Sequence, residues 1–398
     1  MSSNKVNWQT TIAPTINALP DSGLGAFLDI IANNKNIISL SIGEPNFSSP
    51  LPIREKCIQT IEKGITSYTS SYGLLDLRKA IVKSFEKKYG VSYSPEKETL
   101  IAVGVSEALD LAMRILLAPG DEVLIPEPCY VANKACVVLA GGVPVPVPTK
   151  MQDGFAVQVE ELEKHVTAKT KAIIIGYPTN PTGATLNREQ LLKIAQFAEK
   201  HNLIVVSDEL YADLTYEGKH IAFSSLPGMK DRTILLSGFS KAYAMTGFRI
   251  GYVLAPAEVI EAMIAIHQYT MLCAPTLAQY AALEALNSAE EERLSMFEAY
   301  DRRRKIITDG LQKIGLPTFA PQGAFYIFPY IGETGLTSAE FSQQLLTEYE
   351  VAAIPGHAFG ASGEGFIRCS YATSEENIIK ALERIDQFVN KQPKAQVG

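Results

Sequence analysis

Short apolar runs rich in Val and Ile recur between residues 99 and 255, and stretches with helical periodicity separate several of them. The runs lie at 99–103, 122–126, 143–147, 171–176, 203–209, 233–238 and 250–255. They are almost unbroken by polar residues, which is typical of strands that are buried on both faces of a sheet. We therefore expect seven strands.

Helical spacing of apolar residues appears between some of these runs. One such series follows the spacing i, i+3, i+4, i+7, i+8 and ends before Pro119-Gly120; its members are Ala108, Leu111, Ala112, Ile115 and Leu116. A second series comprises Leu191, Ile194, Ala195 and Ala198. Strands that alternate with helices predict an α/β fold with a mostly parallel sheet.

The pattern changes after about residue 256, where a long helical region begins. It contains a charged stretch, Glu290 to Lys305, which we interpret as the solvated face of a helix. A mixed α/β segment follows from about 316, and the last eight residues, KQPKAQVG, resemble a frayed end. We expect a large domain at 48–290 and a smaller α/β domain made of 1–47 and 291–398.

Charge and cysteine usage narrow the class of protein. The 398 residues carry 36 basic and 43 acidic side chains, a net charge of −7, which argues against binding to nucleic acid or to an anionic membrane. The five cysteines show no CxxC spacing, and no apolar run is long enough for a membrane span. We expect a cytoplasmic protein. We expect no metal ligand among the histidines, which are not clustered with carboxylates or cysteines: His165, His201, His220, His267 and His357.

One lysine stands in an unusual setting. GxGxxG, GxxxxGK[ST], GxSxG and HExxH motifs are absent, which disfavours the enzyme classes that use them. Lys241 follows an apolar run, and small residues surround it and Arg249 in SGFSKAYAMTGFRIG, residues 237–251. A lysine amine can form a Schiff base with a carbonyl group, and an arginine can bind a phosphate. Taken alone, a surface lysine and a solvated arginine remain equally acceptable.

This segment resembles the lysine signature of the class I/II pyridoxal-phosphate aminotransferases, which have the fold type I architecture. Further blocks resemble the family in the same order along the chain: SIGEPNF (41–47), YTSSYGLLDLR (68–78), GYPTNPTG (176–183), SDELYADLTYEG (207–218) and GFIRCSYA (365–372). The branch is the one that includes aspartate, aromatic and kynurenine aminotransferases. The resemblance implies pyridoxal 5'-phosphate as the cofactor, with Lys241 as its covalent ligand and proton carrier.

The resemblance also assigns a phosphate site. Val105, Ser106 and Glu107 open a helix directly after the run 99–103, where free N–H groups suit an anion. Glu107 has to bind through its backbone, because its carboxylate would repel the phosphate. Ser240 and Arg249 would supply a hydroxyl and a guanidinium.

The cofactor ring has its own set of residues by resemblance. Asp208, at the end of a predicted strand, would keep the ring nitrogen protonated. Tyr211 and Asn180 would donate to the phenolic oxygen of the ring, and Tyr130 would stack on it. The peptide bonds Asn180–Pro181 and Glu127–Pro128 are expected to be cis.

Substrate and dimer contacts complete the set. Arg368 would bind the α-carboxylate of the substrate, and Gly43 and Asn180 would lie beside it. Tyr68 matches the family tyrosine that reaches the cofactor phosphate of a partner subunit, which implies a homodimer with shared sites. The alternative is that Tyr68 is an ordinary half-buried tyrosine of its own chain.

These features predict an aminotransferase that moves an amino group from an L-amino acid, aromatic or broadly neutral, to a 2-oxo acid such as 2-oxoglutarate. Two alternatives remain open. A pyridoxal-phosphate lyase, either a C–S β-lyase or an aminocyclopropane-forming enzyme, would keep nearly all of these residues. A non-enzymatic, effector-sensing aminotransferase-like domain is the other; such domains accompany a DNA-binding module, for which we find no room before residue 40.

Overall fold

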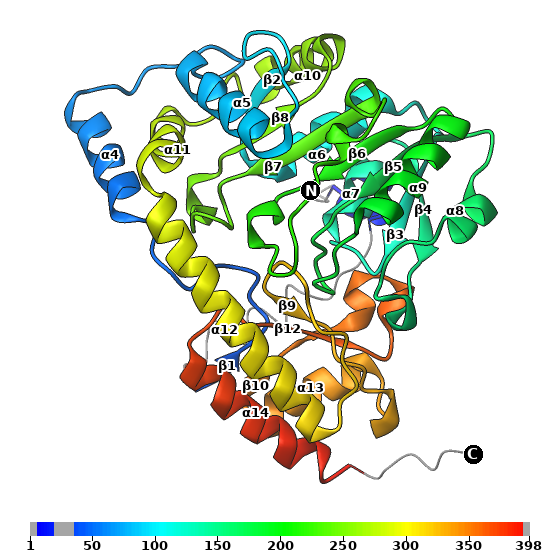
Figure 1. Cartoon of the computed structure of the whole chain (residues 1–398). Coiled ribbons are helices and arrows are strands. Elements are labelled where there is room, and N and C mark those ends of the chain that lie inside the picture. The colour runs from blue at the N-terminus through cyan, green and yellow to red at the C-terminus, as the bar shows by residue number, and fades with distance from the viewer. Residues whose placement is uncertain (1–5, 20–35, 393–398) are drawn as a thin grey trace, which may run out of the picture.

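A seven-stranded sheet forms the centre of the larger part of the molecule (Figure 1). The structure is a computed structural model, which describes residues 6–19 and 36–392. The strands are β2 Thr99–Ala102, β3 Glu122–Glu127, β4 Val143–Pro148, β5 Thr170–Ile175, β6 Ile204–Asp208, β7 Thr233–Gly238 and β8 Gly251–Leu254. Each of their ends lies within one residue of the expected one.

The strand order is β2-β8-β7-β6-β5-β3-β4. β8 runs antiparallel to β2 and β7, and the remaining pairs are parallel. The expectation of a mostly parallel sheet of seven strands is confirmed. Because the carboxyl ends of the parallel strands meet at one edge, the loops after β3, β5, β6 and β7 gather there.

Helices cover both faces of this sheet. One face is packed by α6 Gly104–Leu116, α7 Ala132–Leu139 and α10 Ala257–Thr270, and the other by α5 Leu75–Tyr89, α9 Arg188–Lys200 and α11 Thr276–Ser288. Successive strand residues point to opposite faces, so Leu124 and Ile125 of β3 belong to different cores. α8 Val159–His165 lies beside α9, and α4 Leu51–Glu62 packs on α11. Burial on both faces explains why the strands read as unbroken apolar runs.

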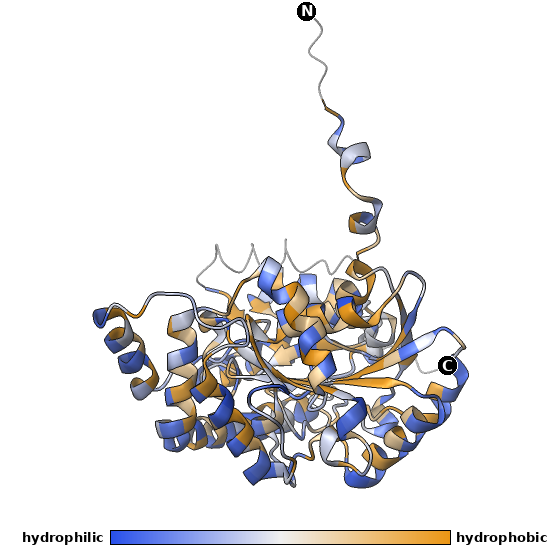
Figure 2. Ribbon diagram, turned by 90° about the horizontal axis from the view of Figure 1, so that it is seen from above, coloured by the Kyte–Doolittle hydropathy of each residue, from blue (hydrophilic) through white to orange (hydrophobic). Residues whose placement is uncertain are grey.

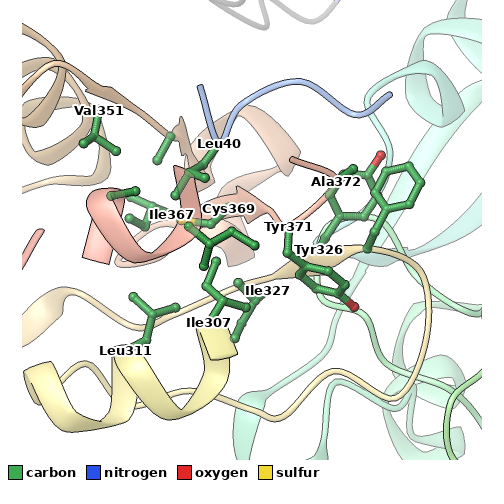
Figure 3. Close-up of a cluster of buried hydrophobic side chains, with 14 of the residues drawn as sticks. Leu40, Ile307, Leu311, Tyr326, Ile327, Val351, Ile367, Cys369, Tyr371 and Ala372 are labelled. Carbon is green, nitrogen blue, oxygen red and sulfur yellow. The ribbon is translucent and has the colours of Figure 1, made fainter. Parts of the chain in front are cut away.

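A second group of elements joins the two ends of the chain. β1 Ile38–Ser39 pairs with β10 Val351–Ala352, and β11 Ile354–Pro355, β12 Ile367–Ser370 and β9 Tyr326–Ile327 form a three-stranded sheet. The helices are α12 Glu290–Ile314, α13 Ser338–Tyr349 and α14 Glu375–Val389. Leu40, from the N-terminal segment, packs in one core with Ile307 and Ile367 (Figure 3). The same core also contains Tyr211, Leu214 and Ala244 of the central segment, so the division into 48–290 and 1–47 with 291–398 stays a prediction. The expected frayed end lies almost wholly outside the described residues.

The interpretation of Glu290–Lys305 as a solvated face is wrong in part. This stretch belongs to α12, which runs from the large sheet towards α14 (Figure 1). Arg303 and Arg304 are buried: Arg303 donates to Asn46 Oδ1 (2.8 Å) and Arg304 to the carbonyl oxygen of Pro321 (2.7 Å). This charged helix face is partly buried because α12 spans two parts of the molecule. The Arg303 and Arg304 guanidinium groups each donate to an acceptor there.

Three X–Pro peptide bonds of the described chain are cis. Glu127–Pro128 and Asn180–Pro181 are cis as predicted, and Tyr177–Pro178, which was not predicted, is cis as well.

The short helices α1 Trp8–Thr11 and α2 Pro14–Asn17 lie on a segment that projects from the body (Figure 2). Among the described helices, none combines the length and the apolar character that crossing a membrane requires.

Candidate active site

A cavity of about 540 Å³ lies at the carboxyl ends of the parallel strands. Most of the candidate residues line it: Gly43, Val105, Ser106, Tyr130, Asn180, Asp208, Tyr211, Ser240, Lys241, Arg249 and Arg368. They come from both ends of the chain and from the loops between, so the fold brings together residues up to 325 positions apart in sequence. Glu107 and Tyr68 do not line the cavity.

Lys241 stands three residues after β7 and points into this cavity. Its Nζ donates a hydrogen bond to the carbonyl oxygen of Gly43 (2.6 Å) and lies 5.8 Å from the centre of the Phe325 ring. Burial, and to a lesser degree the positive charge of Arg368, lowers the pKa of the Lys241 amine to about 8. A larger share of this amine is therefore neutral, and thus nucleophilic, at physiological pH than for an ordinary lysine.

Asp208 ends β6 at the wall of the cavity. Its Oδ1 accepts a hydrogen bond from the backbone N–H of Leu210 (3.1 Å), and no cation of the described chain forms an ion pair with it. Burial raises the pKa of the Asp208 carboxyl to about 6, and the charge of Glu209 adds to this effect. A carboxylate in such a place favours a positively charged ligand atom beside it.

Another part of the cavity suits an anion. Within the described residues, the N–H groups of Gly104, Val105 and Ser106 at the start of α6 have no hydrogen-bond partner. The Arg249 guanidinium lies against this turn, because a Cβ atom added to Gly104 would come within 2.6 Å of Arg249 Nη2. Ser240 adds a hydroxyl. Free helix N–H groups with a guanidinium are a typical phosphate site.

These three features fit pyridoxal phosphate. The helix start and Arg249 can hold its phosphate, and Asp208 can hold its protonated ring nitrogen. Lys241 can bind its carbonyl carbon covalently. The fit rests on the donor set of this chain: an anion site, an unpaired carboxylate and a reactive amine in one cavity.

Arg368, on β12, is held in place from two sides. Its Nη1 donates to Asn180 Oδ1 (3.0 Å) and its Nη2 to the carbonyl oxygen of Ser41 (2.5 Å). The guanidinium lies 4.6 Å from the centre of the Tyr326 ring. Each of these two nitrogens carries a second N–H group, so the side chain, which lines the cavity, keeps donors for a ligand carboxylate.

Tyr326 is a site residue that the sequence did not reveal. Its phenol shares a hydrogen bond with that of Tyr211 (2.8 Å), and a Cβ atom added to Gly43 would meet its hydroxyl at 2.5 Å. Burial raises the pKa of Tyr211 well above its ordinary value. Tyr326 stands in an apolar stretch, GAFYIFP, where nothing in the local sequence distinguishes it from a core residue.

The two candidates outside the cavity have different surroundings. The Glu107 side chain is turned away and contacts His267 (2.6 Å). The Tyr68 side chain is 79% exposed, whereas the alternative expected it to be half-buried; its role in a partner subunit stays a prediction. Within the described chain the Tyr68 phenol has no hydrogen-bond partner, and it is available to another molecule.

Comparison with known proteins gives one consistent result. The sequence model of the family "Aminotransferase class I and II" matches residues 35–385. The putative aminotransferase YugH of Bacillus subtilis is 48% identical over 94% of this chain and 97% of its own length. Aspartate aminotransferase of Pyrococcus abyssi is 45% identical over 93% and 96%. The solved structure of an aromatic aminotransferase from Pyrococcus horikoshii superposes with a TM-score of 0.88 at 44% identity, covering 92% of this chain and 99% of that one.

Proposed function

The chain belongs to the class I and II aminotransferases, an enzyme family that transfers amino groups, and from this we propose its substrates and cofactor. The donor is an aromatic or other neutral L-amino acid, the acceptor is a 2-oxo acid such as 2-oxoglutarate, and the cofactor is pyridoxal phosphate. The relatives are named as aminotransferases, so the lyase and effector-sensing alternatives are not favoured. The five cysteines are unpaired, which supports a reducing, cytoplasmic location as part of the proposal.

The proposed class of amino donor follows from the charged side chains that line the cavity. The cationic side chains that line it among the described residues are Lys241, Arg249 and Arg368. Each already has a proposed ligand group, which is the cofactor carbonyl, the cofactor phosphate and the substrate α-carboxylate, respectively. A second substrate carboxylate would need a further cation, whereas Ile42 and Ile354 offer apolar walls. This favours a neutral side chain.

The chain's own residues divide the work of transamination. When bound, pyridoxal phosphate supplies a carbonyl carbon that condenses with amines and a ring that accepts electrons from the substrate Cα. Asp208 holds the proton on the ring nitrogen. Arg368 binds the substrate carboxylate and thereby orients the Cα–H bond. Lys241 Nζ would take the proton from the substrate Cα as a general base.

A donor screen tests the proposed substrate class. With 2-oxoglutarate as the acceptor, kcat/KM for phenylalanine or tyrosine should exceed that for aspartate by at least about tenfold, because an aspartate side chain would enter the cavity without a partner for its charge. Glutamate formation reports the reaction. A clear preference for aspartate over every neutral donor would contradict the proposed class but leave the transaminase intact.

A homodimer with shared sites is the second part of the proposal. The exposed Tyr68 phenol supports a hydrogen bond to the cofactor phosphate of a partner chain. Tyr68→Phe should weaken cofactor affinity about tenfold, because a hydrogen bond to a charged group is lost.

Mixed dimers test this sharing directly. Lys241→Ala chains paired with Tyr68→Phe chains place both lesions in one site and leave the other site intact. Cofactor affinity at the intact site should return to the wild-type value. An intact site that keeps the weakened affinity of the Tyr68→Phe parent would show that Tyr68 acts within its own chain.

A further inference from the structure

A buried pair of side chains connects the start of α6 to α10 on one face of the large sheet. His267, near the end of α10, is fully buried, and its Nδ1 donates to Glu107 Oε1 over 2.6 Å. Its other nitrogen, Nε2, has no hydrogen-bond partner among the described residues. The imidazole therefore makes its side-chain hydrogen bond to Glu107, and the position of the Glu107 carboxylate depends on it.

The second oxygen of the Glu107 carboxylate reaches back along its own helix. Glu107 Oε2 accepts the backbone N–H of Val103 (2.5 Å), the residue that precedes α6. Val103 has no side-chain oxygen that could cap the helix, so the next three N–H groups stay free for a ligand. Glu107 thus closes the turn before the helix without occupying the donors of its first turn.

A carboxylate in the first turn of a helix is otherwise a competitor for an anion. It is attracted to the same N–H groups and to the positive end of the helix dipole, and its charge repels a phosphate. In this structure both Glu107 oxygens are engaged, by Val103 and by His267, and the side chain does not line the cavity. Val105 and Ser106, which carry two of the free donors, do line it.

We propose that Glu107 and His267 are positioning residues for the cofactor phosphate: Glu107 holds the turn that presents the N–H groups of α6, and His267 holds the Glu107 carboxylate away from the phosphate. This inference rests on the proposed function, because it takes the phosphate of pyridoxal phosphate as the anion. His267 thus affects the binding of the cofactor phosphate indirectly, through Glu107, and does not affect the binding of the cofactor ring.

The measurement is the affinity of the apoprotein for pyridoxal phosphate and for pyridoxal, which lacks the phosphate, both by titration calorimetry. His267→Phe should raise the Kd for pyridoxal phosphate about tenfold and leave the Kd for pyridoxal unchanged, because only the phosphate site loses its geometry. His267→Asn, which keeps a donor near the Nδ1 position, should restore the wild-type ratio of the two Kd values.

Glu107→Leu removes both contacts and should change the same ratio at least as much as His267→Phe. The double variant should be no weaker than Glu107→Leu alone, since His267 acts only through Glu107. Glu107→Leu also keeps the test valid if His267→Phe does not fold. Circular dichroism and the Tm of each apoprotein report the fold.

His220→Phe is a matched control. It removes another imidazole–carboxylate contact of the large domain, His220 Nε2 to Glu209 Oε2 (2.8 Å), which involves no residue of α6 or α10. The ratio of the two Kd values should stay at the wild-type value in this control.

Three results would overturn the inference while leaving the proposed function intact. These are an equal loss of affinity for both ligands, no loss for either, or a change in the ratio in His220→Phe as large as in His267→Phe. Each would mean that the pair is a general structural link. A wild-type apoprotein that binds pyridoxal phosphate no more tightly than pyridoxal would overturn the proposed function and the inference together.

Discussion

Lys241→Ala should abolish steady turnover, with kcat at least about 10⁴-fold lower than in the wild type, because one amine both binds the cofactor and moves the Cα proton. The visible absorption of the lysine-bound cofactor should disappear with it. The fold should survive, because the Lys241 amine donates a single hydrogen bond, to the carbonyl oxygen of Gly43; circular dichroism and Tm can check this. A Lys241→Ala protein that turns over at the wild-type rate would refute the whole assignment.

The lowered pKa of Lys241 adds a pH dependence to this prediction. Only the neutral amine attacks a carbonyl, and the pKa is about 8. The rate at which the apoprotein captures pyridoxal phosphate should therefore rise with pH below about 8 and level off above it. Lys313→Ala, at an exposed position away from the cavity, should leave this profile unchanged. A midpoint near 10.5, the value of an ordinary lysine, would show that burial does not tune this amine.

Asp208→Asn should lower kcat about 100- to 1000-fold, because the variant removes the charge that keeps the cofactor ring nitrogen protonated. The size and the hydrogen-bonding ability of the side chain stay nearly the same, so cofactor binding should weaken less than turnover. Asp208→Glu keeps the charge and should lose less activity than Asp208→Asn. Wild-type turnover in Asp208→Asn would contradict the assigned role.

The same substitution should stabilise the apoprotein at neutral pH. The Asp208 carboxyl has a pKa of 3.8 as an ordinary side chain and of about 6 in the folded protein. The unfolded state therefore binds fewer protons between these values, and the free energy of unfolding falls as pH rises through this window. An asparagine side chain carries no such cost, so the Tm of apo Asp208→Asn at pH 7 should be at least that of the apo wild type. A lower Tm would show that the carboxylate has a stabilising partner.

Local sequence accounts for the strands and for several of the residues at their ends. The apolar runs predicted β2 to β8 because a strand buried on both faces must be apolar at nearly every position. Lys241 stood out because small residues surround it after an apolar run, and Asp208 because it lies at the end of another such run. The family blocks then assigned roles that composition and spacing had left open, and the fold places all of these residues except Glu107 and Tyr68 in one cavity.

Contacts between segments that are distant in sequence could not be predicted from local patterns. The bond from Lys241 to Gly43 spans 198 positions, that from His267 to Glu107 spans 160, and that from Tyr326 to Tyr211 spans 115. The periodicity of a short window reports which face of an element is buried but not what is packed against it. For this reason Tyr326 was indistinguishable from a core residue, Arg303 and Arg304 were taken for solvated charges, and Tyr68 was not known to be exposed. Each of these depended on which elements the packing of the whole chain places side by side, and that is a property of the tertiary structure.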